Sequence, residues 1–172
     1  MPVLINDKDC RTLVVDGDCA YELKLRDTAI FIDFEFVYSL MPEELKAGKL
    51  GEGEHCDAIR VSLSGDKLIV DLIELSMSER RGVEEYYRKF EYCLRFVDFL
   101  MGKIKEKGVK IGVNGRALEI RGLKLNAFIA VNPALVNKLR QGIKKMNPAW
   151  FFKELYNLYP LDEPVVVPCE KP

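Results

Sequence analysis

The chain has 172 residues, of which 48% are hydrophobic and 31% charged, and its formal net charge is −1. These values are typical of one soluble globular domain with a substantial core, and they exclude a disordered or low-complexity chain. There is no run of 18 apolar residues and no basic start followed by an apolar stretch, so we expect neither membrane binding nor a signal peptide.

Cysteine usage indicates the cellular compartment. The chain has an odd number of cysteines with no CxxC pair and no zinc-binding spacing: Cys10, Cys19, Cys56, Cys93 and Cys169. Without an export signal, we expect reduced thiols in a cytoplasmic protein. The single glutamine and the abundance of lysine and glutamate are typical of a thermophile. In that case an intracellular disulfide is an alternative.

Charge is divided unevenly along the chain. Residues 1–79 carry 17 acidic and 8 basic side chains, whereas residues 102–145 carry 11 basic and 2 acidic ones. Such asymmetry favours a surface that binds a polyanion. The alternative is two solvated faces that neutralise each other.

The first half of the chain is predicted to be rich in strands. An Asp-Gly-Asp turn favours a hairpin over residues 11–25. Residues 28–38 are a strand rich in aromatic and β-branched residues. Residues 42–48 form a short helix with proline in its first turn, and residues 55–76 form two strands joined by a tight turn.

The second half is predicted to alternate between helices and strands. Residues 82–108 are the clearest helix, because their apolar residues recur at 3.6 spacing. The elements that follow are a hairpin over 109–122, a strand over 125–132, amphipathic helices over 133–145 and 148–159, and an extended proline-rich tail.

This order predicts an α/β domain, with α+β as the alternative, built on a mixed β-sheet with flanking helices. We expect a single domain over residues 1–160, followed by a tail at residues 161–172 that is a docking arm or the stub of a longer protein.

The hairpin at residues 55–76 can be placed in register. With Gly65 and Asp66 at the centre of its turn, one face becomes entirely apolar. The facing pairs are Leu63 with Leu68, Val61 with Val70 and Ile59 with Leu72. On the other face, Arg60 meets Asp71 in an ion pair.

Continuing outward on the apolar face, Asp57 lands opposite Glu74, and His55 lands opposite Ser76. Two directly opposed carboxylates lie about 5 Å apart at Cβ and repel each other. A shared proton, a neighbouring base such as His55, or a divalent cation would relieve the repulsion. The alternative is that the two acids lie at the solvent-exposed end of the hairpin, where water screens their charges.

Asp57 in CDAIRV, Glu74 in DLIELS and the long helix that follows resemble the restriction-endonuclease-like PD-(D/E)xK nuclease superfamily. The resemblance covers about residues 42–131 and implies a nuclease core that hydrolyses DNA with Mg²⁺ or Mn²⁺. It implies metal ligands from the two acids, the backbone carbonyl of Leu75 and a preceding helix acid. That acid is Glu44 or Glu43, with Glu35 a weaker candidate.

The motif departs from the family at its lysine, because the corresponding position is Ser76. Some members of the family move this lysine to the next helix, where Lys89 is the candidate. Lys89 and His55 are therefore the candidates for positioning water, and the alternatives are a solvated lysine and a surface histidine.

The basic second half would contact the DNA backbone. The candidate phosphate contacts are Arg80, Arg81, Lys103, Arg116, Arg121 and Lys124. Two other functions stay open: an inactive module that binds nucleic acid or a partner protein, and an assembly subunit that forms a homodimer or heteromer through its C-terminal helices.

Overall fold

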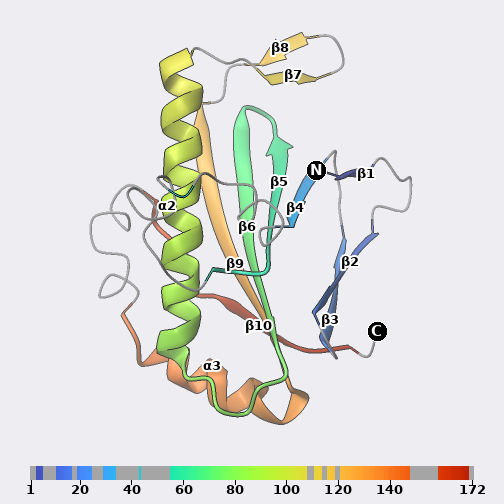
Figure 1. Cartoon of the computed structure of the whole chain (residues 1–172), viewed down its shortest axis with the longest axis vertical. Helices are drawn as coiled ribbons and strands as arrows, with labels where there is room; N and C mark the ends of the chain where they lie inside the picture. Colours follow the sequence, from blue (N-terminus) through green and yellow to red (C-terminus); the bar gives the residue numbers. More distant parts are fainter. Residues whose placement is uncertain are drawn as a thin grey trace.

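The structure is a computed structural model. It describes residues 3–5, 11–16, 19–24, 29–33, 43, 55–107, 111–113, 116–118, 121–147 and 159–170. At its centre is a six-stranded sheet in the order β1-β4-β5-β6-β9-β10 (Figure 1). Its strands are β1 (Val3–Ile5), β4 (Ala29–Asp33), β5 (Ala58–Ser64), β6 (Lys67–Ser76), β9 (Gly122–Val131) and β10 (Val165–Pro168).

The sheet is mixed, as the order of elements predicted. The pairs β1–β4, β4–β5 and β5–β6 are antiparallel. Helix α2 (Val83–Lys107) then connects β6 to β9, which pairs with β6 in parallel. Strand β10 adds a further parallel partner on β9. The protein is therefore of the mixed α/β class.

The predicted register of the β5–β6 hairpin is confirmed. Leu63 pairs with Leu68, and Ile59 pairs with Leu72. Gly65 adopts a φ of +63°, a left-handed conformation that glycine reaches without a steric penalty. The turn chemistry thus sets which residues face each side of the sheet.

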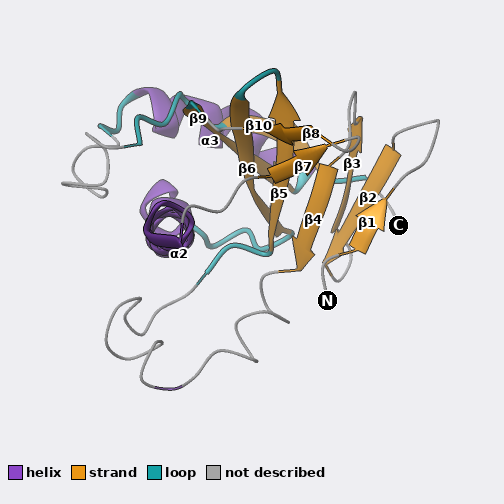
Figure 2. Ribbon diagram, turned by 90° about the horizontal axis from the view of Figure 1, so that it is seen from above, coloured by secondary structure: helices purple, strands orange, loops and turns teal. Residues whose placement is uncertain are grey.

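The two faces of the sheet pack against different layers (Figure 2). Ile59, Val70 and Leu72 belong to the larger core, together with the buried stripe of α2. On the opposite face, Ile73 and Leu75 pack with Cys19 of strand β3. Each fully buried leucine or isoleucine contributes roughly 1.5–3 kcal/mol, so the alternation along the hairpin fixes the layer order.

A predicted ion pair lies on that opposite face. The guanidinium of Arg60 meets the Asp71 carboxylate at 2.5 Å, and Asn126 of β9 donates to the same carboxylate at 2.8 Å. Asp71 is buried, so these partners offset the cost of removing its charge from water.

Two small sheets and a second helical segment complete the described elements. They are the hairpins β2 (Arg11–Asp16) with β3 (Cys19–Lys24) and β7 (Ile111–Val113) with β8 (Arg116–Leu118), then the 3₁₀ turn η2 (Pro133–Leu135) and helix α3 (Val136–Lys144). The predictions for these segments are confirmed. The predicted helix at 148–159 lies outside the described residues, as does that at 42–48 except for the helical Glu43.

The C-terminal tail differs from the expectation of a separate arm. It supplies β10, and Cys169 joins Cys19 in a disulfide that links residues 150 positions apart. A second disulfide joins Cys56 to Cys93 of α2. The expectation of reduced thiols is therefore wrong for these four cysteines, because the fold brings them together in pairs. Cys10 lies outside the described residues.

Across the described residues, the helices lack the combined length and apolar character needed to cross a membrane.

The Cys19–Cys169 disulfide closes the longer loop of the two, so it removes the most freedom from the unfolded chain. We expect the Cys19→Ser/Cys169→Ser variant to lose roughly 3–5 kcal/mol of unfolding free energy in urea titration. Adding reductant to this variant should still lower its stability through the second disulfide. Equal stability of variant and wild type would contradict the pairing.

Helices α2 and α3 meet at a glycine. A Cβ on Gly142 would lie 2.7 Å from Val83 Cγ2, whereas a Cβ on Gly102 of α2 would meet nothing within 4 Å. We expect Gly142→Ala to destabilise the protein by about 1–2 kcal/mol because the helices must separate. Gly102→Ala should stabilise it by about 0.5–1 kcal/mol. Thermal unfolding of both variants measures the difference, and equal effects would contradict the close packing.

Candidate functional site

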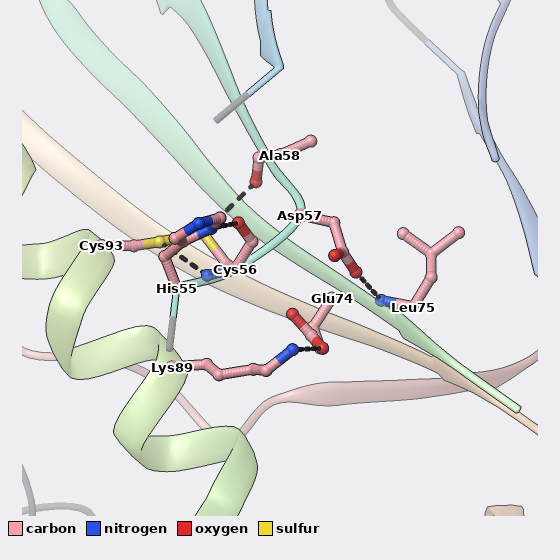
Figure 3. Close-up of a disulfide and its surroundings, with 8 residues drawn as sticks. All are labelled: His55, Cys56, Asp57, Ala58, Glu74, Leu75, Lys89 and Cys93. Carbon is pink, nitrogen blue, oxygen red and sulfur yellow. Dashed lines mark hydrogen bonds and ion pairs between the residues drawn. A yellow bond between two sulfur atoms is a disulfide. The ribbon is translucent and has the colours of Figure 1, made fainter. Parts of the chain in front are cut away.

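The two carboxylates predicted to meet do so at one end of the sheet. Asp57 immediately precedes β5, and its backbone N–H donates to the carbonyl of Ile73 at 3.0 Å. Glu74 lies near the end of β6. Figure 3 shows both carboxylates on the same side, close to each other. The ladder itself ends one residue before Asp57, and the bond from Asp57 to Ile73 keeps the two acids at the same end of the sheet.

Glu74 is fully buried and is held by two cations. Its Oε1 accepts hydrogen bonds from Lys89 Nζ at 2.5 Å and Arg81 Nη1 at 2.7 Å. Lys89, from α2, is itself buried, with 7% of its surface exposed. The second oxygen of Glu74, Oε2, is buried without a hydrogen-bond partner. One carboxylate oxygen is thus satisfied, and the other is left for a further ligand or a proton.

Burial, followed by the nearby Asp57 charge, raises the pKa of Glu74 from 4.5 to about 8. Lys89 and Arg81 act in the opposite direction, but they offset only part of the desolvation. Glu74 therefore changes its protonation state near neutral pH, as a group that exchanges a proton for a cation would do.

Asp57 is fixed by the strand beside it. Its Oδ2 accepts a hydrogen bond from the backbone N–H of Leu75 at 2.7 Å. Leu75 thus connects the two acids through its backbone, while its side chain packs in the smaller core. This contact orients the Asp57 carboxylate relative to Glu74.

A disulfide borders the site. Cys56 directly precedes Asp57, and Cys93 lies one helical turn after Lys89 on α2. The bond therefore ties the residue before Asp57 to the helix that presents Lys89 (Figure 3). The sequence gave no spacing signal for this pair, because the two residues meet only after the helix packs on the sheet.

His55 is not opposite Ser76. The ladder of β5 and β6 ends at Ala58 and Ile73, so it stops before the chain reaches His55 and Ser76. The His55 ring lies 6.1 Å from the Tyr92 ring and contacts the Cys56 carbonyl at 3.0 Å. The expected placement is wrong because the chain leaves the ladder before reaching His55.

Ser76, at the position of the family's lysine, has a structural partner. Its hydroxyl shares a hydrogen bond with Tyr86, a buried tyrosine of α2 whose pKa is raised by desolvation. Ser76 also accepts from the backbone N–H of Ser78. The lysine beside Glu74 therefore comes from the helix, while the serine helps to join β6 to that helix.

The donor set suits a hard cation only in part. Asp57, Glu74 and the Leu75 carbonyl are oxygen donors of the kind that Mg²⁺ takes. The buried Oε2 of Glu74 without a partner is consistent with such a ligand. Within the described ranges, no three His, Cys, Asp or Glu side chains gather as a metal cluster. Glu44 and Glu35 lie outside those ranges, and Glu43 is an exposed helical residue. These oxygen donors would therefore suit a Mg²⁺ ion that keeps several bound waters, and not an ion whose ligands all come from the protein.

The predicted phosphate contacts fall into two groups. Arg80 and Arg81 lie in the connection from β6 to α2, and Arg81 is engaged by the Glu74 carboxylate. Lys124 pairs with Ile69, about 17 Å along the strand from Glu74. Arg121 donates its backbone N–H to Asp66 of the far turn.

The remaining two lie at that far end as well. Lys103 is about 21 Å along α2 from Lys89. Arg116 is in β8, beyond the end of α2 (Figure 1). Because the polypeptide runs the full length of the sheet between the groups, the six basic residues do not form one surface.

Sequence reasoning missed the basic residues that do lie near the site. Helix α3 and the residue after it carry Lys138, Arg140, Lys144 and Lys145, all exposed, and residues 132–147 contain no acid. The charge asymmetry contained this signal. Only the parallel pairing of β6 with β9 shows that the segment following β9 returns to the end of the sheet where Glu74 lies.

No protein-family model, curated protein or solved structure matches this chain. The functional argument therefore depends on the geometry of the site.

The pKa of Glu74 predicts a pH-dependent stability. A pKa of about 8 in the folded state lies above the ordinary 4.5, so the folded protein binds a proton that the unfolded chain releases. The stability that Glu74 contributes is fully present below about pH 4.5 and falls as pH rises towards 8, by on the order of 4 kcal/mol. We expect Glu74→Gln to remove this decrease in urea titrations between pH 5 and pH 8.

Asp71→Asn is the matched control, because Asp71 is a buried acid of the same strand that pairs with Arg60. This variant should be less stable and yet keep the wild-type dependence on pH. An unchanged pH dependence in Glu74→Gln would show that Glu74 is ionised throughout the range.

Proposed function

We propose that this protein is a divalent-metal-dependent nuclease with a restriction-endonuclease-like core, in which Asp57 and Glu74 bind Mg²⁺ or Mn²⁺. The observation that carries the proposal is the buried Glu74 carboxylate, placed beside Asp57 with one oxygen unpartnered and the other on Lys89. A buried carboxylate beside a second, half-buried acid is costly unless a proton or cation joins them.

The arrangement of elements supports the proposal. The antiparallel β5–β6 hairpin carries both acids, α2 crosses over the sheet, and β9 returns in parallel beside β6. An order of strand hairpin, crossover helix and parallel strand is compatible with a restriction-endonuclease-like core. Lys89 reaches Glu74 from the helix, where the family's relocated lysine is expected.

The charges of the site are suited to a phosphodiester. Lys89 and Arg81 balance the two acids when both acids are ionised. When bound, Mg²⁺ lowers the pKa of a water molecule and neutralises charge on the phosphate. With a metal held by the acids, Lys89 would be placed to orient the attacking water and Arg81 to contact the phosphate. Asp57 stays fixed by the Leu75 N–H.

The basic α3 segment supports nucleic acid as the substrate, because it lies at the same end of the sheet as the acids (Figure 1). Phosphate contacts of this kind hold the backbone without reading sequence. A cytoplasmic location in a thermophile remains part of the proposal, since intracellular proteins of such organisms retain disulfides.

A non-catalytic module that binds nucleic acid is the second candidate. Glu74 Oε1 already accepts from two cations, and Ser76 occupies the usual lysine position. A buried acid with a purely structural role would also hold such cationic partners. The C-terminal segment at 148–159, on which the assembly-subunit hypothesis depends, lies outside the described residues.

The test is cleavage of plasmid and single-stranded DNA with Mg²⁺, with Mn²⁺ and with chelator. We expect metal-dependent cleavage that Asp57→Asn and Glu74→Gln abolish. Lys89→Met should reduce it by about 100-fold, since Lys89 would orient the nucleophile. Activity should rise with pH towards 8, because metal binding requires the Glu74 proton to leave.

Glu91→Gln is the matched control, because Glu91 lies on the same helix and forms an ion pair with the exposed Arg95. Its activity should equal that of the wild type. Cleavage that survives both acid substitutions would exclude this site. Salt-sensitive DNA binding without cleavage would establish the non-catalytic module instead.

A further inference from the structure

A cavity of about 300 Å³ lies between the start of α2 and helix α3. It is near the carboxyl ends of the parallel strands β6 and β9, where ligands bind in open α/β sheets. Figure 1 shows these two helices meeting at that end. Its lining residues are Glu79, Arg81, Gly82, Val83, Tyr86, Val131, Leu135, Lys138, Leu139, Gln141, Gly142 and Lys145.

The charged part of the lining favours an anion. Arg81, Lys138 and Lys145 contribute three positive charges, and Glu79 contributes one negative charge. Among the residues that the structure describes, neither of the two lysines pairs with a carboxylate. Both are exposed, so they can close on a ligand. A phosphate group is the anion that such a set of donors suits.

The start of α2 adds to this preference. Gly82 and Val83 bring the first turn of a 25-residue helix to the cavity. The N-terminal end of a helix carries a partial positive charge, and its backbone N–H groups can donate hydrogen bonds to an anion. This contribution is secondary to the three side chains.

The rest of the lining includes apolar side chains and side chains that can form hydrogen bonds. Val83, Leu135 and Leu139 form an apolar surface, and Glu79 and Gln141 can accept from a hydroxyl or amino group. The volume is at the lower end for small-molecule sites. The lining thus combines a phosphate site with a small apolar wall, as a single nucleotide requires.

Arg81 connects the cavity to the acids. It lines the cavity and donates to Glu74 Oε1 at 2.7 Å. A ligand held there therefore lies one arginine side chain away from the proposed metal site.

We propose that this cavity binds a single phosphate-bearing nucleotide, with the phosphate on Lys138, Lys145 and Arg81. The nucleotide is either a free mononucleotide or the phosphorylated end of a strand. The strand-end form rests on the proposed nuclease function and would make the enzyme act from phosphorylated ends. Phosphate binding by the cavity does not depend on cleavage.

The test measures binding by isothermal titration calorimetry in chelator, so that metal and cleavage do not contribute. The ligands are a nucleoside 5′-monophosphate, inorganic phosphate and the unphosphorylated nucleoside. We expect the monophosphate to bind more tightly than either fragment, because it meets both parts of the lining. Lys138→Ala and Lys145→Ala should each weaken its binding about tenfold.

Lys144→Ala is the matched control, because it removes the same charge from α3 outside the cavity lining. It should leave the affinity unchanged. An absence of monophosphate binding, or equal losses in all three lysine variants, would overturn the cavity assignment. Neither result would bear on metal-dependent cleavage, which is measured separately.

A second comparison distinguishes the source of the nucleotide. Oligonucleotides with 5′-phosphate, 3′-phosphate or hydroxyl ends are titrated against wild type and Lys138→Ala. Binding about tenfold tighter to one phosphorylated end, and lost in the variant, would support recognition of a strand end. Equal binding to all ends, with the monophosphate still bound, would overturn strand-end recognition and support a free mononucleotide.

Discussion

The contact of Glu74 with Lys89 joins the two main layers of this protein. It links the end of β6 to the second turn of α2 inside a region that excludes water. A carboxylate placed there must have partners, because desolvation of an isolated charge costs more than most single contacts contribute. Arg81 supplies a second partner, yet the Glu74 pKa remains raised to about 8. The site is thus stable but incompletely satisfied, which is a common property of functional sites.

The surroundings of this contact leave it little freedom. Asp57 is oriented by the Leu75 N–H, and the Cys56–Cys93 disulfide holds the adjoining strand residue to α2. The two acids and the lysine are therefore held in a fixed relative arrangement, which the proposed metal-assisted hydrolysis would require.

Basic residues lie at both ends of the central sheet. The basic residues predicted to contact nucleic acid are spread over both ends of the sheet. The uneven charge along the sequence therefore does not correspond to one continuous basic surface. At the end with the two acids, the exposed lysines of α3 border a cavity that also reaches Arg81. The arrangement places three cationic side chains of the cavity lining beside a carboxylate pair, which is the combination that the proposed function requires.

The sequence by itself determined the β5–β6 hairpin, its register and the meeting of Asp57 with Glu74, because a glycine-containing turn and strict apolar alternation are local signals. It also determined the long helix. Only the tertiary structure decided that Lys89 reaches Glu74, that His55 leaves the ladder and that β10 joins the sheet. It alone paired the cysteines and brought α3 to the acids. These contacts join residues far apart in the chain, and their distances depend on how the layers pack, which periodicity does not encode.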